Sequence, residues 1–335
     1  MPDGRATNDP SNYFAFGKQS AKDTEATTFI FTRHLDGTGY ELDEQVESVR
    51  EGGDGQEVGF VHKTAISADG DCIVNSRPVI GAALSAWTLG ANNVAAGTAA
   101  ATGVSQVITA IPTSSQPYLT VEQRWADKIE RVSNVQVSGL TLEGEAGRPM
   151  KLSSNFVAGG TPWTRPVASA LTPARESGQP HFYPGGSYVL TGATGAKMTK
   201  FKTEIRRNQD TDIRTTSLFR EDVVGLNLDI NFEATFKYED EQLYNRVHYL
   251  ASNGTIDPNA MGLATGAFSA YSEFGTGTSL RFFKQDLTML AYTGARVNKL
   301  DPDGKTMYID VSAIGVKGAT HSAINQFSVP SGTVV

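Results

Sequence analysis

The sequence of 335 residues contains a single cysteine, Cys72. One thiol cannot form an intrachain disulfide, and it cannot build a thiolate metal cluster. No apolar run approaches the roughly 18 residues that a membrane-spanning helix needs, and the N-terminal stretch lacks the apolar segment of a signal peptide. We therefore expect a protein without disulfides or a membrane anchor that is made and assembled in the cytoplasm.

Sequence motifs of catalysis and cofactor binding are also missing. The five histidines show no spacing typical of a metal site, and no nucleophile elbow, phosphate-binding loop or dinucleotide fingerprint occurs. The stretch DPDGKT at 301–306 resembles the start of a calcium loop but lacks the later ligands, so we interpret it as a turn. Glu143 and Glu145 offer a pair of carboxylates, which we interpret as a solvated hairpin end. We expect no enzyme activity, no metal and no cofactor.

Charged residues are scarce, at 19% of the chain, and the formal net charge is −7. An acidic protein of this kind does not hold nucleic acid by releasing counterions from phosphates, although nucleic acid could slide past it. The 34 glycines and the long runs of small residues favour a mainly β protein with many turns. The length allows one large domain or two domains of ordinary size.

Alternating apolar and polar residues predict most of the strands. The clearest signal is a hairpin over 131–156, with a bulge at Gly139 where the alternation shifts by one residue. Further strands are predicted at 28–35, 58–68, 116–126, 198–207, 224–238, 279–290 and 306–316. Long loops are predicted at 39–57, 90–116 and 261–278.

Two short helices are predicted from the spacing of apolar residues. The first spans 76–92, with Ser76 as its N-cap and a proline in its first turn, and it ends at Gly90. The second spans 240–254, with Asp240 as its N-cap. Each helix follows a predicted strand and precedes a loop of small residues.

The order of elements therefore repeats along the chain, and the hairpin at 131–156 corresponds to the two strands within 279–316. The two helices begin 163 residues apart, at Pro78 and Glu241. We interpret the repeat as two diverged copies of one unit, although two unrelated β-rich halves would also fit.

The predicted fold is mainly β. It consists of two tandem β-sandwich or β-barrel domains, each flanked by one short α-helix, with long loops and an extended N-terminal arm. The arm covers 1–27, the first domain 28–165, a linker rich in proline and small residues 166–184, and the second domain 185–335.

Charge is unevenly distributed between the two halves. Residues 41–57 contain seven acidic residues and one basic residue, whereas 197–220 contain seven basic and three acidic residues. Opposite charge at similar places in two copies suits head-to-tail self-association, although two solvated segments that never meet would also fit. The candidate contact residues are Glu41, Asp43, Glu44, Glu47, Lys200, Lys202, Arg206, Arg207 and Arg214.

Three segments, 118–160, 185–213 and 221–254, carry a resemblance to a known family. The first contains the strand-and-hairpin pattern VSGLTLEGEAGRPMK, and the last contains LNLDINFEATF followed by DEQLYNRV. In these segments the chain resembles the longer major tail tube proteins of siphovirus-type bacteriophages and related viruses. The resemblance covers about two-thirds of the chain and rests on patterns of fold rather than of catalysis.

The resemblance implies β-sandwich or β-barrel units that form rings, and rings that stack into the hollow tail tube of a virion. Three copies of a duplicated chain would form a pseudo-sixfold ring, where the short members of the family use six; the sequence leaves trimer and hexamer open. Viral DNA would pass through the lumen without specific binding, and the stretch 36–57 would reach the neighbouring ring. Implied partners are further copies of the chain and the tape-measure, tail terminator and distal tail proteins. The long N-terminus and the 90–116 loop depart from the family pattern.

Two other classes of protein remain open. One is another structural virus protein, such as a capsid decoration or baseplate component. The other is a carbohydrate-binding or hydrolytic β-sandwich, which would need an exposed aromatic platform or two carboxylates across a cleft.

Overall fold

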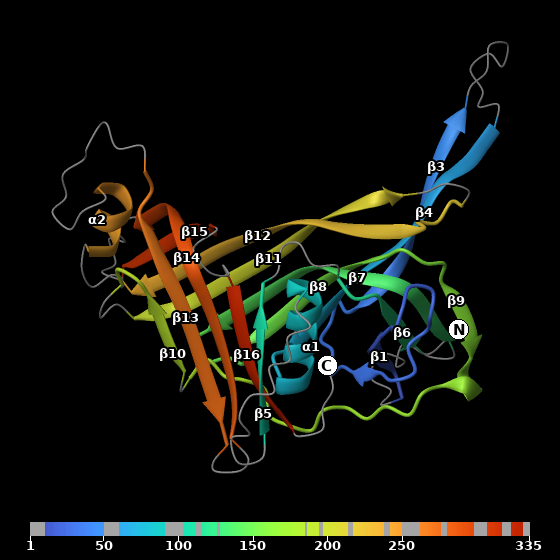
Figure 1. The fold of residues 1–335 in the computed structure, drawn as a ribbon, viewed down its shortest axis with the longest axis horizontal. Coiled ribbons are helices and arrows are strands. Elements are labelled where there is room, and N and C mark those ends of the chain that lie inside the picture. Colours follow the sequence, from blue (N-terminus) through green and yellow to red (C-terminus); the bar gives the residue numbers. More distant parts are fainter. Residues whose placement is uncertain are drawn as a thin grey trace.

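The computed structural model describes residues 11–49, 60–90, 103–110, 116–125, 128–184, 186–193, 197–213, 217–237, 242–249, 262–275, 280–297, 307–316 and 323–330. Over this part of the chain the protein is mainly β with two α-helices, as predicted (Figure 1). The strands before residue 170 are β1 (Tyr13–Lys18), β2 (Ile30–Phe31), β3 (Gly39–Val49), β4 (Phe60–Asn75), β5 (Gly103–Thr109), β6 (Leu119–Trp125), β7 (Lys128–Glu145), β8 (Lys151–Ala158) and β9 (Trp163–Pro166). The later strands are β10 (Ser187–Leu190), β11 (Met198–Ile213), β12 (Asp222–Lys237), β13 (Thr265–Phe274), β14 (Arg281–Val297), β15 (Tyr308–Gly315) and β16 (Ala323–Pro330). The helices are α1 (Pro78–Leu89) and α2 (Gln242–Tyr249), and a 3₁₀ turn covers Val167–Ser169.

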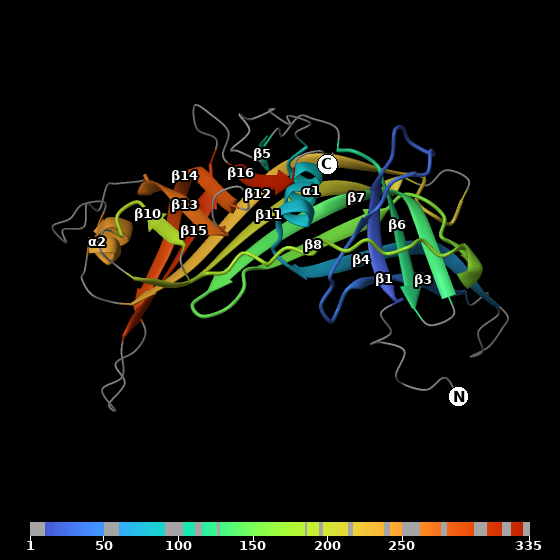
Figure 2. The same cartoon turned by 90° about the horizontal axis from the view of Figure 1, so that it is seen from below.

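Eight strands lie side by side in the order β14-β15-β12-β11-β7-β8-β4-β3, all antiparallel to their neighbours (Figure 2). Side chains alternate between the two faces of this sheet. One face is apolar and buried, as at Phe201 and Leu142, and the other is polar, as at Lys202 and Glu143. The two outer strands, β14 and β3, lie towards opposite ends of the long axis of the molecule (Figure 1).

Strand pairing follows the same order before and after residue 185. The order is β1-β6-β7-β8-β4-β3 in the first half and β10-β13-β14-β15-β12-β11 in the second. β7 and β14 also carry a bulge at the same place, just before Gly139 and Gly294, and the predicted bulge at Gly139 is confirmed. In this order β11 takes the place in the second half that β3 takes in the first.

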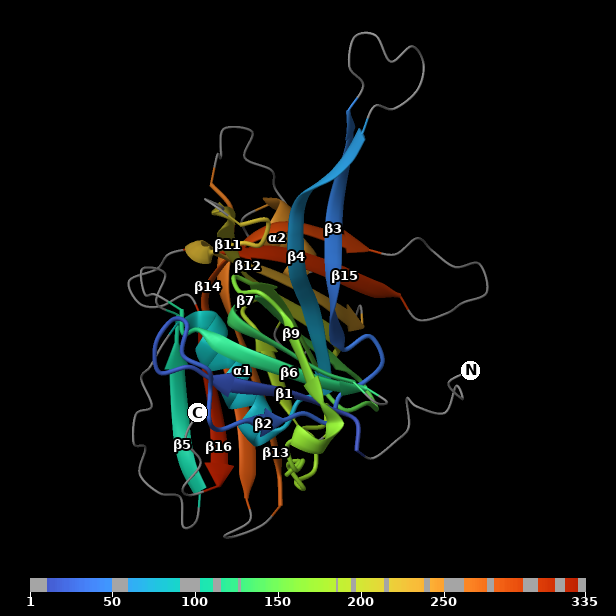
Figure 3. The same cartoon turned by 90° about the vertical axis from the view of Figure 1, so that its right-hand side faces the viewer.

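Several predicted boundaries are wrong. Residues 11–27 are not a free arm, because β1 lies between β2 and β6 and is buried over Tyr13–Gly17. The predicted loop at 39–57 contains β3, which pairs with β4 in a hairpin that projects from the body of the protein (Figure 3). The predicted loops at 90–116 and 261–278 contain β5 and β13.

The start of α1 is fixed by a residue far away in the sequence. Arg77, not Ser76, is the N-cap, and it supplies no side-chain hydrogen bond. The Glu176 carboxylate instead accepts from the backbone N–H of Val79 at 3.1 Å, where the helix dipole favours an anion. The helix ends at Gly90 as predicted, with a left-handed φ of 75° that glycine adopts without strain.

One hydrophobic cluster runs through both halves of the described structure. Phe16 and Trp87 from the first half belong to it, as do Phe201 and Phe232 from the second. β5 pairs with β16, which joins an early strand to a late one. The two predicted domains therefore share a core in this chain.

Residues 166–184, predicted as a linker, lie against the first half of the chain. Arg33 donates to the Glu176 carbonyl at 2.7 Å, and Met150 N–H donates to the His181 carbonyl at 2.8 Å. Leu171 N–H donates to the Tyr13 hydroxyl at 3.1 Å. The segment is therefore a strap that holds β1, β8 and α1 together.

The second helix is confirmed over Gln242–Tyr249, the described part of the predicted span 240–254. Leu243 is buried, and Val247 packs against the hydrophobic cluster, so the apolar stripe faces the core. The predicted N-cap, Asp240, and the DPDGKT turn at 301–306 lie outside the described residues.

Candidate assembly interface

The two halves are joined by an antiparallel junction between β7 and β11. Ile205 lies opposite Leu140 there, and both side chains are buried. The oppositely charged pairs along the same ladder are Lys200–Glu145 and Lys202–Glu143. Cross-strand pairs of this kind each stabilise a ladder by about 0.2–1 kcal/mol. The junction therefore combines a backbone ladder, an apolar contact and a row of complementary charges.

Beyond this ladder, the outer part of the β11–β12 hairpin docks on the first half. Arg207 is 2% exposed, and its guanidinium donates to the Thr88 and Leu89 carbonyls at 3.0 and 2.8 Å. This places a cation at the C-terminus of α1, where the helix dipole favours it. Arg220 forms an ion pair with Asp69 at 2.5 Å. The second hairpin is thus anchored on the first half by its base and by its outer part.

The strand in the corresponding place of the first half, β3, has an open edge. Among the described residues β3 pairs with β4 alone. Tyr40 N–H donates to Gln123 Oε1 at 3.2 Å, and Gln123 Nε2 donates to the Tyr40 carbonyl at 3.3 Å. Because backbone groups alternate in direction along a strand, those of Leu42 also point to the open edge. The Leu42 side chain is 53% exposed.

A groove of about 880 Å³ runs along this open edge of β3. It lies between residues 39–42 of β3 and residues 123–125 at the end of β6. The groove borders the backbone of residues 39–42, where the Gln123 amide already bonds the groups of Tyr40. It therefore marks the place where another strand could lie beside β3.

The edge of β14 is open beyond the point where β13 leaves it, at the pair Thr265–Ala291, and no strand among the described residues covers it there. His248 Nε2 lies 2.7 Å from the Ala295 carbonyl oxygen, so this carbonyl points away from β15 and towards the open edge. Arg296 is exposed beside it. A groove of about 460 Å³ extends from this edge across the polar face to β11.

The predicted acidic contact residues lie together on the exposed part of β3. Glu41, Asp43, Glu44 and Glu47 are all exposed. Glu44 forms an ion pair with Lys63 of β4 at 2.6 Å. The β3–β4 hairpin that carries these residues extends beyond the rest of the sheet (Figure 3).

Four of the five predicted basic contact residues lie on β11, which is already paired on both edges by β12 and β7. Lys200 and Lys202 face acidic residues of β7, and Arg206 forms an ion pair with Glu204 at 2.6 Å. Arg207 is buried within the chain, so its prediction as a surface contact is wrong. Arg214 lies outside the described residues. A direct contact between the acidic and basic stretches of two copies stays a prediction.

Sequence reasoning missed the residues that border the two open edges. Gln123 and His248 lie outside the two charged stretches at 41–57 and 197–220. Leu42 lies inside the acidic stretch but carries no charge. Arg296 could have been found by aligning Gly139 with Gly294, because both glycines follow a bulge in equivalent strands. That alignment requires the strand order, which the sequence did not supply.

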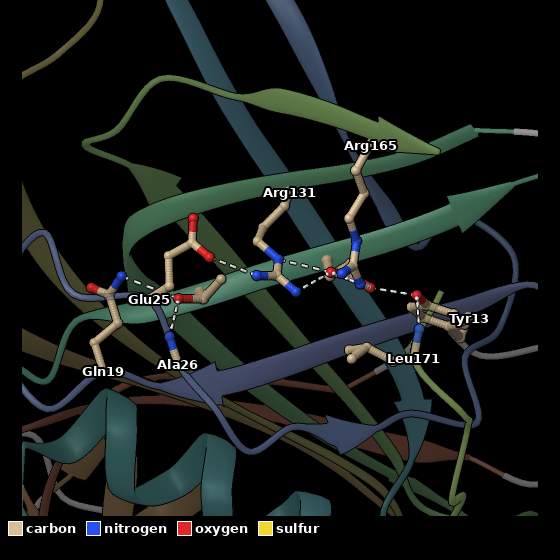
Figure 4. A network of polar contacts seen from close by, with 9 residues as sticks. Tyr13, Gln19, Glu25, Ala26, Arg131, Arg165 and Leu171 are labelled. Carbon is tan, nitrogen blue, oxygen red and sulfur yellow. Dashed lines mark hydrogen bonds and ion pairs between the residues drawn. The ribbon is translucent and has the colours of Figure 1, made fainter. Parts of the chain in front are cut away.

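A buried charge network lies beside the groove at the β3 edge, and its member Tyr13 lines that groove (Figure 4). The Glu122 carboxylate is fully buried and contacts Arg131 at 2.6 Å and Arg165 at 2.5 Å. The Tyr13 hydroxyl donates to the same carboxylate, and burial together with this contact raises the pKa of Tyr13. The network ties β1, β6, β7 and β9 together, so we interpret it as structural.

In the part of the chain that the structure describes, no group of three or more His, Cys, Asp or Glu side chains could hold a metal ion, and neither helix is long and apolar enough to cross a membrane. Burial raises the pKa of Cys72, which keeps its thiol protonated. Glu143 and Glu145 face lysines across a ladder rather than each other across a cleft.

Comparison of the sequence with protein-family models finds no match. Comparison with curated proteins finds no similar sequence.

Proposed function

We propose that the protein is a structural subunit whose copies join edge to edge into rings, and that the rings stack into the hollow tail tube of a long-tailed virus. The single observation that carries the proposal is the junction between β7 and β11. It joins two halves with the same strand order, and the corresponding strands, β14 and β3, have open edges at the two ends of the sheet. A second copy can therefore repeat outside the chain the pairing that already exists inside it.

Head-to-tail pairing of this kind supports a closed ring. Each copy offers one β3 edge and one β14 edge, so every interface has the same partners and both of these edges are paired when the ring closes. Open edges are an aggregation hazard unless pairing is controlled, and closure removes the hazard at these two edges. If the two halves are copies of one unit, three chains give a pseudo-sixfold ring.

The polar face of the eight-stranded sheet supports the assignment of that face to the lumen. Its side chains form rows in which acidic and basic residues alternate across the strands. One row is Arg296, Asp310, Thr235, Lys200 and Glu145, and the next contains Glu233, Lys202, Glu143 and Lys151. Such rows present no continuous basic stripe, so DNA phosphates would not be held and the genome could slide.

The position of the β3–β4 hairpin supports stacking. This hairpin projects beyond the sheet and carries exposed acidic residues together with exposed Val46, Phe60 and Val61 (Figure 3). Exposed apolar side chains on a projecting element are typical of a surface that a partner covers. In the proposed virion, the tape-measure, terminator and distal tail proteins would contact the lumen and the two ends of the tube.

The test is negative-stain electron microscopy of the purified full chain over a range of concentrations, with sedimentation velocity on the same samples. Stacked rings or tubes with a central hole are the expected result. Isolated rings that never stack would favour another structural role, such as a baseplate component. A monomer that persists at all concentrations and binds a glycan array would overturn the proposal in favour of a carbohydrate-binding protein.

A further inference from the structure

We propose that the open edge of β14 in one copy pairs with the open edge of β3 in the next copy in one defined register, with Leu42 opposite Ala295 and Glu41 opposite Arg296. This inference rests on the proposed function and names the partner surfaces that form each ring interface. In the isolated subunit, the side chains of Gln123 and His248 contact the backbone groups that would form hydrogen bonds with the incoming strand.

The register follows from matching the two halves of the chain. Starting at the bulges in β7 and β14, one row of paired residues can be followed across each four-stranded half. The two rows are Val137–Phe156–Gly70–Tyr40 and Tyr292–Ala313–Phe232–Thr203. Tyr40 thus corresponds to Thr203, and Leu42 corresponds to Ile205.

The partner strand is matched in the same way. Ile205 pairs with Leu140, the residue after Gly139. The residue after Gly294 is Ala295, so the corresponding partner of Leu42 is Ala295 of another copy. The next pair along the ladder is Glu41 with Arg296.

The backbone directions on the two open edges agree with this register. The hydrogen bonds of Tyr40 with Gln123 show that the amide and carbonyl of Tyr40, and hence those of Leu42, point away from β4. The contact of His248 with the Ala295 carbonyl shows that Ala295 points away from β15. Leu42 and Ala295 can therefore exchange both backbone hydrogen bonds, as a hydrogen-bonded antiparallel pair requires.

The side chains also fit. Leu42 is 53% exposed, whereas its counterpart Ile205 is 1% exposed under β7, so the proposed pairing covers an apolar side chain that is open in the isolated subunit. Glu41 and Arg296 are both exposed and have opposite charge. The internal junction places basic β11 residues opposite acidic β7 residues, and the proposed interface keeps this complementarity with the signs reversed.

Two side chains must give way when the strands pair. Gln123 bonds both backbone groups of Tyr40, and His248 bonds the Ala295 carbonyl, so each occupies a position that the partner strand takes. Each side chain satisfies backbone groups that would otherwise be left open at a strand edge. Gln123 and His248 therefore bond these backbone groups until the strand of a second copy displaces them.

Disulfide cross-linking tests the register directly. Glu41 and Arg296 would form a non-hydrogen-bonded pair, with Cα atoms about 4.5 Å apart, a distance that a disulfide can span. The variant Glu41→Cys with Arg296→Cys should therefore form intermolecular disulfides in assembled, oxidised protein, giving dimers and trimers on non-reducing gels. The matched control, Asp43→Cys with Arg296→Cys, places the two cysteines on diagonal positions about 7–8 Å apart, and should cross-link at least tenfold less. Native Cys72 is fully buried and does not compete.

The outcomes separate the register from the proposed function. If rings form and the control pair cross-links better than the Glu41–Arg296 pair, or neither cross-links, the register is wrong while ring assembly stands. If the unmodified chain forms neither rings nor tubes at any concentration and no cross-link appears, both proposals fail. Unmodified rings together with selective cross-linking of the Glu41–Arg296 pair support both.

Discussion

The Gln123 side chain occupies the open edge of β3 at Tyr40, where its amide accepts from the Tyr40 N–H at 3.2 Å and donates to the Tyr40 carbonyl at 3.3 Å. A single side chain thereby makes both hydrogen bonds that a neighbouring strand would make. Gln123 also donates to Glu130 at 3.0 Å, which fixes the amide in place. At Tyr40 the edge is therefore satisfied in the isolated subunit without being paired with a strand.

Replacing Gln123 should change the balance between free subunits and rings. In Gln123→Ala the Tyr40 backbone loses both partners, which costs the isolated subunit about 1 kcal/mol, whereas the ring regains them from the added strand. We therefore expect assembly at a protein concentration several-fold lower than for the unmodified chain, measured by sedimentation velocity. Gln19→Ala removes another buried glutamine, which bonds Thr120 instead, and should leave the threshold unchanged. A threshold that is unchanged or higher in Gln123→Ala would show that Gln123 is not in the path of a partner strand.

The proposed pairing of Glu41 with Arg296 predicts a charge-swap result. Glu41→Arg or Arg296→Glu alone would place like charges opposite each other, which should cost about 1 kcal/mol per interface and weaken association about fivefold. The double variant should restore assembly, because it returns opposite charges to the pair. Ring yield at low ionic strength measures the effect, since salt screens exposed charges.

The control for the charge swap is Arg148→Glu. Arg148 is an exposed residue in the turn between β7 and β8, where it pairs with Glu145 at 2.9 Å, and it should have little effect on ring yield. A double variant that assembles no better than the single variants would contradict the proposed register. Assembly should weaken further when all four acidic residues of β3 are changed to Lys, namely Glu41, Asp43, Glu44 and Glu47. An unchanged tube yield would show that β3 is not part of the interface.

The sequence predicted the mainly β class and the elements with strong apolar alternation. The hairpin at 131–156 and its bulge at Gly139 are examples, because buried and exposed residues alternate there along both strands. It did not predict β3, because most of its side chains are exposed and only Tyr40 is buried, so no buried apolar face marks the strand. Ladder hydrogen bonds with β4 hold this strand, and those depend on a partner rather than on local sequence.

The candidate site could be predicted only in part for a similar reason. The acidic residues from Glu41 to Glu47 were found because charge is visible in sequence. Arg207 was misassigned, because a buried arginine that bonds helix carbonyls has the same sequence signal as a surface one. The open edges themselves are properties of strand order, which depends in part on contacts between residues more than 60 positions apart, such as Leu140 with Ile205.

The buried carboxylate of Glu122 predicts a large loss of stability when its charge is removed. In Glu122→Gln, the guanidinium groups of Arg131 and Arg165 would stay largely buried without their shared anion. Breaking one side of a buried ion pair costs about 3–5 kcal/mol, so we expect a loss in that range in the free energy of unfolding by urea. Glu145→Gln removes a surface carboxylate and should cost less than about 1 kcal/mol. Equal losses in the two variants would show that the network contributes no more than a surface pair.

His181 lies in the strap at the boundary between the two halves. It is fully buried against the rings of Phe274 and Phe283, and its Nδ1 lies 3.3 Å from the Ser76 hydroxyl. Burial lowers the pKa of His181 to about 4, an effect that Arg77 reinforces and a backbone hydrogen bond with Ser76 opposes. The folded protein therefore holds this imidazole neutral at pH values where the unfolded chain protonates it.

This burial predicts an acid-dependent loss of stability with a defined window. Since the folded pKa lies below the unfolded value of 6.5, the stability is fully present above pH 6.5 and falls as the pH is lowered towards 4, by about 3 kcal/mol. His181→Asn keeps a polar partner for Ser76 but cannot titrate, so its unfolding free energy should decline less steeply over this window. His62→Asn, a substitution of an exposed histidine on β4, should leave the slope unchanged. The measurement is urea unfolding between pH 4 and pH 7.5 at concentrations below assembly, and parallel curves for the unmodified chain and His181→Asn would contradict the prediction.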